Sequence, residues 1–249
     1  MRVFHFLITS IVLLAAMPRA EAQSPPPRPY MPVAITRPTA SEDASFTAFR
    51  TALAAAAKNR VYAELAALVL PQGFFWDRDF ANRFDARRPA VDNLALAIGL
   101  EQRDGIGWMS LAEFAEQAAA ETLDSRPGVI CAPPRPDYDG VAFAKLLDTT
   151  YTGAIGWAYP RADSTAVHAA AKPGAAVVGT LGPHFVRLLG FEGADSEPPR
   201  TRWAHVVLPD GKTGYAAPDN LMSLTTERLC YIKDLVAGWR IAGIIEGGN

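Results

Sequence analysis

The residues of this chain that could do chemistry are few, and their spacing forms no known catalytic motif. Cys131 lies in an Ile-Cys-Ala-Pro-Pro stretch and Cys230 in the middle of an apolar run, and neither position begins a helix that would activate a thiolate. A cysteine hydrolase also needs a histidine beside the thiolate. Beyond the first 22 residues the histidines are His168, His184 and His205, whose separation excludes the short histidine motifs of zinc sites and leaves only a cluster assembled in space.

Carboxylates offer one further route to catalysis. Asp77 and Asp79 are spaced like a pair on one face of a strand, but general acid/base work also needs a pocket around them. The chain contains no Gly-x-Ser-x-Gly nucleophile elbow and no glycine-rich phosphate loop. We therefore predict a protein that is not an enzyme, with no catalytic residues, no metal site and no cofactor.

The stretch around these aspartates mixes aromatic side chains with charges of both signs. Trp76, Asp77, Arg78 and Asp79 belong to the sequence FFWDRDFANRFDARR. One interpretation is a secondary binding surface, in which aromatic rings supply contact area and arginines supply forked donors. The other is a half-buried strand and turn whose outer charges pair with one another, each pair contributing little.

Composition bounds the class of protein. The chain has 249 residues, of which 49% are hydrophobic and 20% are charged, so a globular core is expected rather than disorder. A formal net charge of -2 gives no electrostatic basis for binding nucleic acid or an anionic membrane surface. Nucleic acid is therefore not expected among the partners of this protein.

The N-terminus is typical of an exported protein. Residues 1–22 combine Arg2, an apolar run and the cleavage-site pattern Ala20-Glu21-Ala22, which predicts a signal peptide; an uncleaved anchor is the alternative. No later stretch is long and apolar enough to span a bilayer, so no membrane segment is expected after cleavage. Residues 23–38 are proline-rich and are predicted to be an extended tether that packs as neither helix nor sheet. We expect a periplasmic or secreted protein.

Export changes the interpretation of the two cysteines. An oxidising compartment would let Cys131 and Cys230 form a disulfide, and two separate buried thiols are the alternative. A bridge that closes a loop of about 100 residues contributes at most about 4–5 kcal/mol in the chain-entropy model.

Residues 39–160 read as a mainly helical domain. Apolar residues recur at helical spacing at Phe46, Phe49 and Leu53, after a start capped at Thr39 or Ser41. Further helices are predicted at 61–70, after Pro89, from a capping box at 110–113, and at 143–147. Residues 226–246 read as a C-terminal β-hairpin that lies against this domain if the disulfide forms.

From residue 164 the pattern changes to short alternating strands. The sequence WAHVVLPDGKTGYAAPDNL contains a Pro-Asp-Gly turn between two strands, which is a strong hairpin signal. Along the first strand Trp203 and His205 lie on one face and Ala204 and Val206 on the other. Five such strands punctuated by glycine and proline indicate a small β-barrel over 164–224.

This segment resembles the bacterial SH3-like domain family. The resemblance is carried by KPGAAVVGTL at 172–181, FVRLL at 185–189, WAHVV at 203–207 and, most closely, GKTGYAAPDNL at 211–221. It departs from the family pattern at Val167-His168-Ala169 and in the long loop 190–201, so ligand specificity is not carried over. The resemblance implies a ligand-binding groove at or near Trp203 and Tyr215, to which we add His205, Asp219 and Asn220; the alternative is that the two aromatic residues belong to the core and rim of the barrel.

The chain is thus predicted to be an α+β protein with a mainly helical N-terminal domain, a small SH3-like β-barrel and a C-terminal β-hairpin. The resemblance implies a non-catalytic, exported binding protein that recognises cell-wall peptide or a protein of the cell envelope. Two alternatives are a cell-wall hydrolase or accessory enzyme whose active site lies in the N-terminal domain, and a structural or inhibitory envelope protein.

Overall fold

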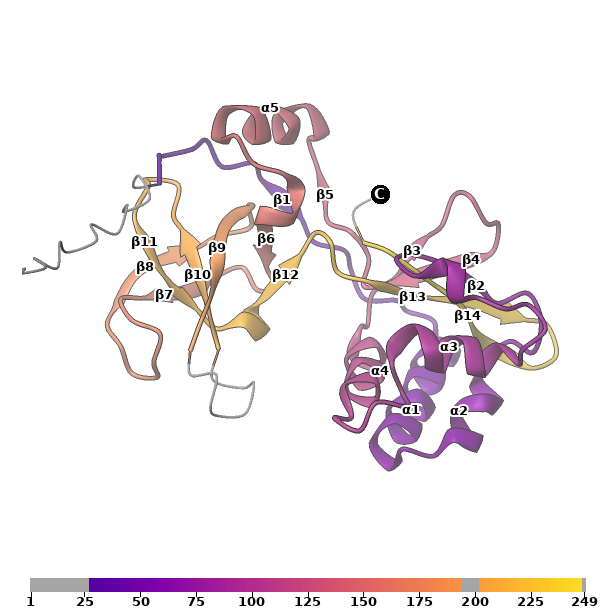
Figure 1. Cartoon of the computed structure of the whole chain (residues 1–249). Helices are drawn as coiled ribbons and strands as arrows, with labels where there is room; N and C mark the ends of the chain where they lie inside the picture. Colours follow the sequence, from indigo (N-terminus) through magenta and orange to yellow (C-terminus); the bar gives the residue numbers. More distant parts are fainter. Residues whose placement is uncertain (1–26, 194–201, 248–249) are drawn as a thin grey trace, which may run out of the picture.

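The computed structural model describes residues 27–193 and 202–247, so the predicted signal peptide at 1–22 lies outside the described residues. The described chain contains both helices and sheets, which confirms the α+β class (Figure 1). Its α-helices are α1 (Ala44–Asn59), α2 (Tyr62–Leu68), α3 (Ala90–Ile98), α4 (Ile106–Glu116) and α5 (Gly140–Thr150). Short 3₁₀ turns are η1 (Ala81–Arg83), η2 (Ala154–Gly156) and η4 (Pro218–Asn220).

The strands of the described residues form three sheets. One is seven-stranded in the order β12-β6-β9-β10-β11-β7-β8, one is five-stranded in the order β2-β14-β13-β4-β3, and in the third β1 pairs with β5. The strands are β1 (Ile35–Thr36), β2 (Phe75–Asp77), β3 (Glu121–Thr122), β4 (Val129–Ala132), β5 (Asp137–Tyr138), β6 (Trp157–Pro160), β7 (Thr165–His168), β8 (Val177–Leu181), β9 (Val186–Glu192), β10 (Trp203–Val207), β11 (Thr213–Ala216), β12 (Leu221–Ser223), β13 (Arg228–Asp234) and β14 (Gly238–Ile245).

Figure 1 shows these elements in two lobes. The helical lobe consists of the five-stranded sheet with α1 to α4, and the sheet lobe consists of the seven-stranded sheet with α5 and the small β1–β5 sheet. The order of elements makes the chain cross between the lobes three times, from β1 to α1, from β4 to β5, and from β12 to β13. The C-terminal hairpin β13–β14 therefore returns to the lobe in which α1 to α4 lie.

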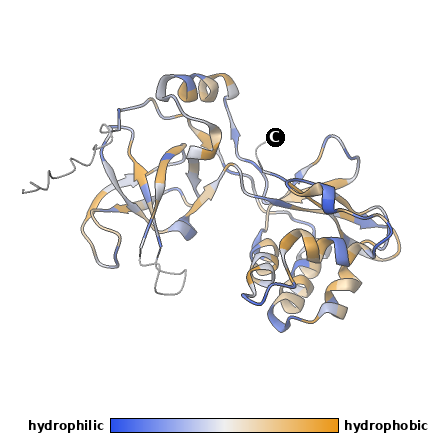
Figure 2. Cartoon of the chain, in the orientation of Figure 1, coloured by the Kyte–Doolittle hydropathy of each residue, from blue (hydrophilic) through white to orange (hydrophobic). Residues whose placement is uncertain are grey.

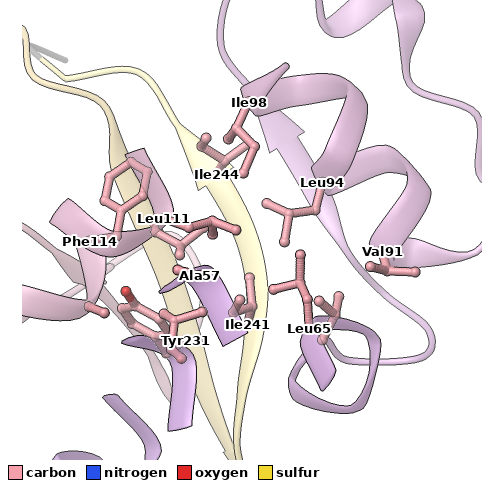
Figure 3. Packing of buried hydrophobic residues seen from close by; sticks show 14 of the residues in the cluster. Ala57, Leu65, Val91, Leu94, Ile98, Leu111, Phe114, Tyr231, Ile241 and Ile244 are labelled. Atoms are coloured by element: carbon pink, nitrogen blue, oxygen red, sulfur yellow. The ribbon is translucent and has the colours of Figure 1, made fainter. Parts of the chain in front are cut away.

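Helix α1 supplies much of the helical lobe's core. Phe46, Phe49 and Leu53 are all buried, as their helical spacing predicts. Their cluster includes residues of α3, α4 and the hairpin, several of which are drawn in Figure 3. Helix α3 is hydrophobic over much of its length in Figure 2, consistent with its packing against β2 and β14. The cap differs from the prediction, because the side chain of Asp43 accepts hydrogen bonds from the backbone of Ser45 and Phe46.

Helix α4 begins earlier than its sequence predicts. The expected capping box at 110–113 is wrong, because the helix starts at Ile106 and Ser110 lies in its interior. Gly105 precedes the helix with a φ of 74°, a conformation that glycine adopts at no steric cost. Gly107 lies so close to the preceding loop that a Cβ atom would be 2.5 Å from the carbonyl oxygen of Ile98. This close backbone approach sets the start of α4.

The C-terminal hairpin occupies the centre of the five-stranded sheet. Strand β13 pairs with β14 on one side and with β4 on the other, and Cys230 lies directly opposite Cys131. The two residues are joined by a disulfide with Cα atoms 4.0 Å apart, and both are fully buried. The predicted disulfide is confirmed, and it ties the hairpin to β4.

The proline-rich segment is only in part what its composition predicts. Tyr30, Val33 and Ile35 are buried in the sheet lobe, where they join a core with Trp157 and Phe185. The Ile35 amide donates to the carbonyl oxygen of Pro183, and β1 pairs with β5. The prediction that residues 23–38 pack as neither helix nor sheet is therefore wrong for residues 30–36, since apolar residues between the prolines bury against distant parts of the chain.

The helical domain also ends earlier than the predicted boundary at residue 160. Helix α5 buries Phe143 and Leu146 in the core of the sheet lobe, and β6 pairs with β9 and β12 of the seven-stranded sheet. Residues 137–160 therefore pack with the predicted barrel segment rather than with α1 to α4. The apolar side chains of α5 could pack equally well in the core of either lobe. Their helical spacing therefore does not predict that α5 packs in the sheet lobe.

Replacing Tyr231 with phenylalanine is expected to stabilise the protein by about 1 kcal/mol. The Tyr231 ring packs 5.3 Å from Phe46 and 5.5 Å from Phe49, between ring centroids. Its hydroxyl is fully buried and has no hydrogen-bond partner among the described residues, and this burial raises the pKa of Tyr231. The substitution removes a desolvated polar group and keeps the ring, and urea unfolding followed by circular dichroism measures the gain.

Tyr30 offers the matched control for this prediction. Its hydroxyl is also buried but donates a hydrogen bond of 2.9 Å to the carbonyl oxygen of Val207. Tyr30→Phe should therefore destabilise the protein by about 1 kcal/mol, because it leaves that carbonyl oxygen without its partner. Destabilisation by both substitutions would show that the Tyr231 hydroxyl has a partner in solution, such as a bound water.

Candidate functional site

The hairpin β10–β11 positions the residues that the sequence assigned to a groove. Its turn has the predicted Pro-Asp-Gly geometry: the side chain of Asp210 accepts from the Lys212 amide at 3.0 Å, and Gly211 has a φ of 86°. The Leu208 amide then donates to the carbonyl oxygen of Lys212, which closes the turn. This local geometry sets the register of the two strands.

The register brings five side chains to one face of neighbouring strands. His205 lies opposite Tyr215 on one side and Gly190 on the other, and Tyr215 lies opposite His168 of β7. Trp203, two residues before His205, lies opposite Glu192 at the end of β9. Because residues directly opposite each other in a sheet share a face, these side chains lie on the same side of the sheet.

Side chains on this face contact one another in two ring pairs. The rings of His205 and Tyr215 stack with centroids 4.7 Å apart and an interplanar angle of 17°. Trp203 meets His168 edge to face, with centroids 5.4 Å apart. Glu192 binds the His205–Tyr215 stack, because the Tyr215 hydroxyl donates to one carboxylate oxygen at 2.7 Å and the Nδ1 atom of His205 lies 3.1 Å from the other.

We call these five residues the aromatic platform: Trp203, His205, Tyr215, His168 and Glu192. The first four are half-buried, and the Glu192 side chain is 50% exposed. The hydrogen bond to Glu192 is the main reason that the pKa of Tyr215 is raised. The platform therefore combines partly exposed ring surfaces with one carboxylate, and its own contacts hold the rings in place.

The opposite face of the same strands is core. Ala204, Val206 and Ala216 are fully buried, in a cluster with Val167 of β7 and Leu181 of β8. From Trp203 to Val206 the alternation along β10 divides inward from outward residues as the sequence predicts, but Val207, which shares the face of Trp203 and His205, is fully buried in the core that includes Phe143 of α5. Trp203 and Tyr215 are half-buried and lie outside this core cluster.

Two members of the platform were missed by reasoning from the sequence. The sequence marks His168 only as part of a departure from the family pattern, and Glu192 only as part of the long loop 190–201. Neither is near Trp203 or Tyr215 in the sequence, and they meet because β9 and β7 flank the β10–β11 hairpin. An acidic residue at the end of one strand and a histidine at the end of another were the available signals, but only the strand order makes them neighbours.

Asp219 and Asn220 lie apart from the platform's contacts. Both are exposed in the turn η4 that follows β11. The carbonyl oxygen of Asn220 accepts a hydrogen bond from the Arg161 amide. Within the described residues no hydrogen bond, ion pair or ring contact joins either residue to the platform.

The predicted secondary surface lies in the helical lobe. Trp76 is 8% exposed and belongs to the core, and its indole N–H donates to the backbone oxygen of Asp79 at 3.2 Å. Arg78 forms an ion pair with Glu227. Asp77 and Asp79 are exposed. The Trp76 ring is therefore not available as a surface aromatic, and the ion pair that Arg78 forms within the described residues is with Glu227, outside this stretch.

The structure also places the two cysteines and the side chains that could bind a metal ion. Both cysteines are in the disulfide, so neither presents a thiol. Across residues 27–193 and 202–247, no group of three or more histidine, cysteine, aspartate or glutamate side chains is arranged to hold a metal ion. Among the described helices, none combines the length and apolar character of a bilayer span.

Comparison of the chain with protein-family models, with curated proteins and with solved structures finds no significant match.

Proposed function

We propose that the protein is an exported, non-catalytic binding protein whose SH3-like module, over residues 164–224, presents the aromatic platform to peptide of the cell wall. The observation that carries this proposal is the platform itself, in which Trp203, His205 and Tyr215 share one partly exposed face and are held by Glu192 and His168. A protein of the envelope is the other class of partner that such a surface fits.

The strand arrangement supports an SH3-like module. The five strands that the resemblance requires are paired consecutively in the order β9-β10-β11-β7-β8. Their inward side chains form one apolar cluster, to which β6 and β12 also contribute. A small sheet that wraps around a single core leaves its outward face for binding.

The geometry of the rings supports peptide binding. Aromatic side chains offer large contact areas with few rotatable bonds, so a ligand that covers them loses little side-chain entropy. The contacts among Trp203, His168, His205 and Tyr215 hold these rings before any ligand arrives. Residues of this kind commonly contribute most of the binding energy of an interface.

Two features support an envelope location. The sequence of residues 1–22 has the pattern of a signal peptide. The Cys131–Cys230 disulfide is stable in an oxidising compartment and rare in the cytosol.

Replacing Trp203 with alanine is expected to reduce binding to purified peptidoglycan about tenfold or more, because loss of a central aromatic residue typically costs about 2 kcal/mol at an interface. The measurement is co-sedimentation of the mature chain with peptidoglycan over a range of protein concentrations. Tyr151→Ala is the matched control, since Tyr151 is 88% exposed and lies on α5's C-terminal cap, outside the platform. Circular dichroism checks that both variants fold.

The same experiment separates the other functions. Release of soluble fragments from peptidoglycan would show a hydrolase, in conflict with a non-catalytic role. Another outcome is that the wild-type protein and both variants all fail to sediment with peptidoglycan. In that case a pull-down from envelope extract with wild type and Trp203→Ala decides between a protein partner and a purely structural role. Equal recovery of partners by both proteins would contradict the assignment of the platform.

A further inference from the structure

The helical lobe carries a groove that the proposed function does not use. It has a volume of about 520 Å³, within the range of about 300–1,000 Å³ typical of ligand pockets. One wall is the loop from Pro71 to Gly73, which follows α2, and the other is the stretch from Phe84 to Arg88, which precedes α3. Figure 1 shows β2, between these two loops in the chain, and α3 in the helical lobe.

The floor of the groove is apolar. Phe74 is 6% exposed and Ala90 is 7% exposed, and both line the groove from the core side. Phe84 also lines it and is only partly buried, so part of its ring surface remains accessible. An apolar side chain that entered the groove would cover this surface, and the hydrophobic effect would favour its binding.

One wall is held in place by a buried side chain. Asn93 of α3 is 1% exposed, and its amide oxygen accepts a hydrogen bond of 3.1 Å from the Asp85 backbone amide. Its amide nitrogen donates to the carbonyl oxygen of Asp85 at 2.9 Å. The Arg88 amide in turn donates to the same carbonyl oxygen at 3.0 Å. Since these bonds order the loop in advance, a ligand does not lose affinity by ordering it.

The rim of the groove carries a positive charge. Arg87 and Arg88 are adjacent, but Asp85 pairs with Arg87, whose Nε lies 3.1 Å from its carboxylate. Arg88 acts on Asp85 only through a weaker electrostatic effect. Arg88 lines the groove, and within the described residues its guanidinium forms no ion pair. The groove therefore joins an apolar floor to a guanidinium that is available to a carboxylate.

We propose that this groove binds the apolar C-terminal end of a polypeptide, with Arg88 pairing with the terminal carboxylate and the Phe74–Phe84 floor taking the last apolar side chain. Gln72 lines the opposite wall and supplies an amide that both donates and accepts, as a peptide backbone requires. A groove volume of about 520 Å³ can accommodate more than one residue of the bound peptide. This site lies in the helical lobe, apart from the aromatic platform, so the two proposals stand independently.

The test uses the mature, disulfide-bonded chain and the peptide acetyl-Ala-Ala-Leu-Phe, with either a free carboxylate or a C-terminal amide. Isothermal titration calorimetry should show the acid binding about fivefold more tightly than the amide, the upper range for an exposed ion pair. Arg88→Gln should reduce the affinity for the acid about fivefold, to that of the amide. Arg87→Gln should leave both affinities unchanged, because Arg87 does not line the groove.

A second pair of variants tests the floor. Phe84→Ala should weaken the acid and the amide alike, whereas Phe80→Ala should change neither, since Phe80 is 68% exposed and lies outside the groove. The proposal is overturned if acid and amide bind equally, if Arg88→Gln binds the acid like wild type, or if neither peptide binds at millimolar concentration. Equal affinity for the tetrapeptide and for N-acetyl-phenylalanine would also overturn it, by showing a site for small apolar acids.

Discussion

Replacing Cys131 and Cys230 together with alanine is expected to lower the free energy of unfolding by about 3–4 kcal/mol. The bridge joins residues separated by 99 positions, and a cross-link of that span removes much of the entropy of the unfolded chain. Both side chains are fully buried between β4 and β13, so packing is also lost. Urea unfolding of wild type and double variant, with the slope of the transition compared, measures the change.

The reduced wild-type protein is the control for this prediction. Reduction breaks the same bridge but keeps both sulfur atoms in the core, so its loss of stability should be similar to or slightly smaller than that of the double variant. The prediction also has a functional consequence, because the chain should lose stability in a reducing compartment. A double variant as stable as the oxidised wild type would contradict the role assigned to the bridge.

Replacing Glu121 with glutamine is expected to destabilise the protein by about 3 kcal/mol, because it leaves the charge of Arg228 buried without compensation. The Arg228 side chain is 4% exposed and forms an ion pair with Glu121, which also accepts from Arg135 at 3.0 Å. Burial lowers the pKa of Arg228, and the nearby charge of Arg135 adds to this effect. Removing the carboxylate charge would leave two guanidinium groups close together.

A second substitution separates this effect from a simple loss of packing. Arg228→Met, combined with Glu121→Gln, removes the buried charge and should recover most of the lost stability, since a buried pair contributes little over apolar side chains of similar volume. Glu116→Gln is the matched surface control and should change stability by no more than about 0.5 kcal/mol. If Glu121→Gln alone is as mild as this control, solvent reaches Arg228 and the charge is not buried in solution.

Local patterns predicted the elements of the helical lobe well. The spacing of Phe46, Phe49 and Leu53 places one face of α1 in the core, where the structure buries all three. The apolar terminal run was predicted to be a hairpin against this domain, and β13 and β14 form it. These predictions succeed because a helix or hairpin of this length carries its own periodicity and turn residues.

In the sheet lobe, local sequence patterns do not predict which segments are buried. Tyr30, Val33 and Ile35 lie between prolines that favour an extended tether, yet all three are buried. Helix α5 lies in the predicted helical domain by sequence, yet Phe143 and Leu146 are buried in the core of the sheet lobe. In both cases the cluster also contains residues distant in sequence, such as Phe185 and Val207, and the free energy of that burial outweighs the local preference.

The sequence by itself determined which residues of the platform strand point outward, because alternation along β10 separates Trp203 and His205 from the buried Ala204 and Val206. Only the tertiary structure decided that His168 and Glu192 complete the platform, and that the loops beside β2 enclose a groove rimmed by Arg88. The physical reason is that periodicity and turn chemistry act over a few neighbouring residues, whereas strand order and loop packing are chosen by burial and hydrogen bonding between distant segments.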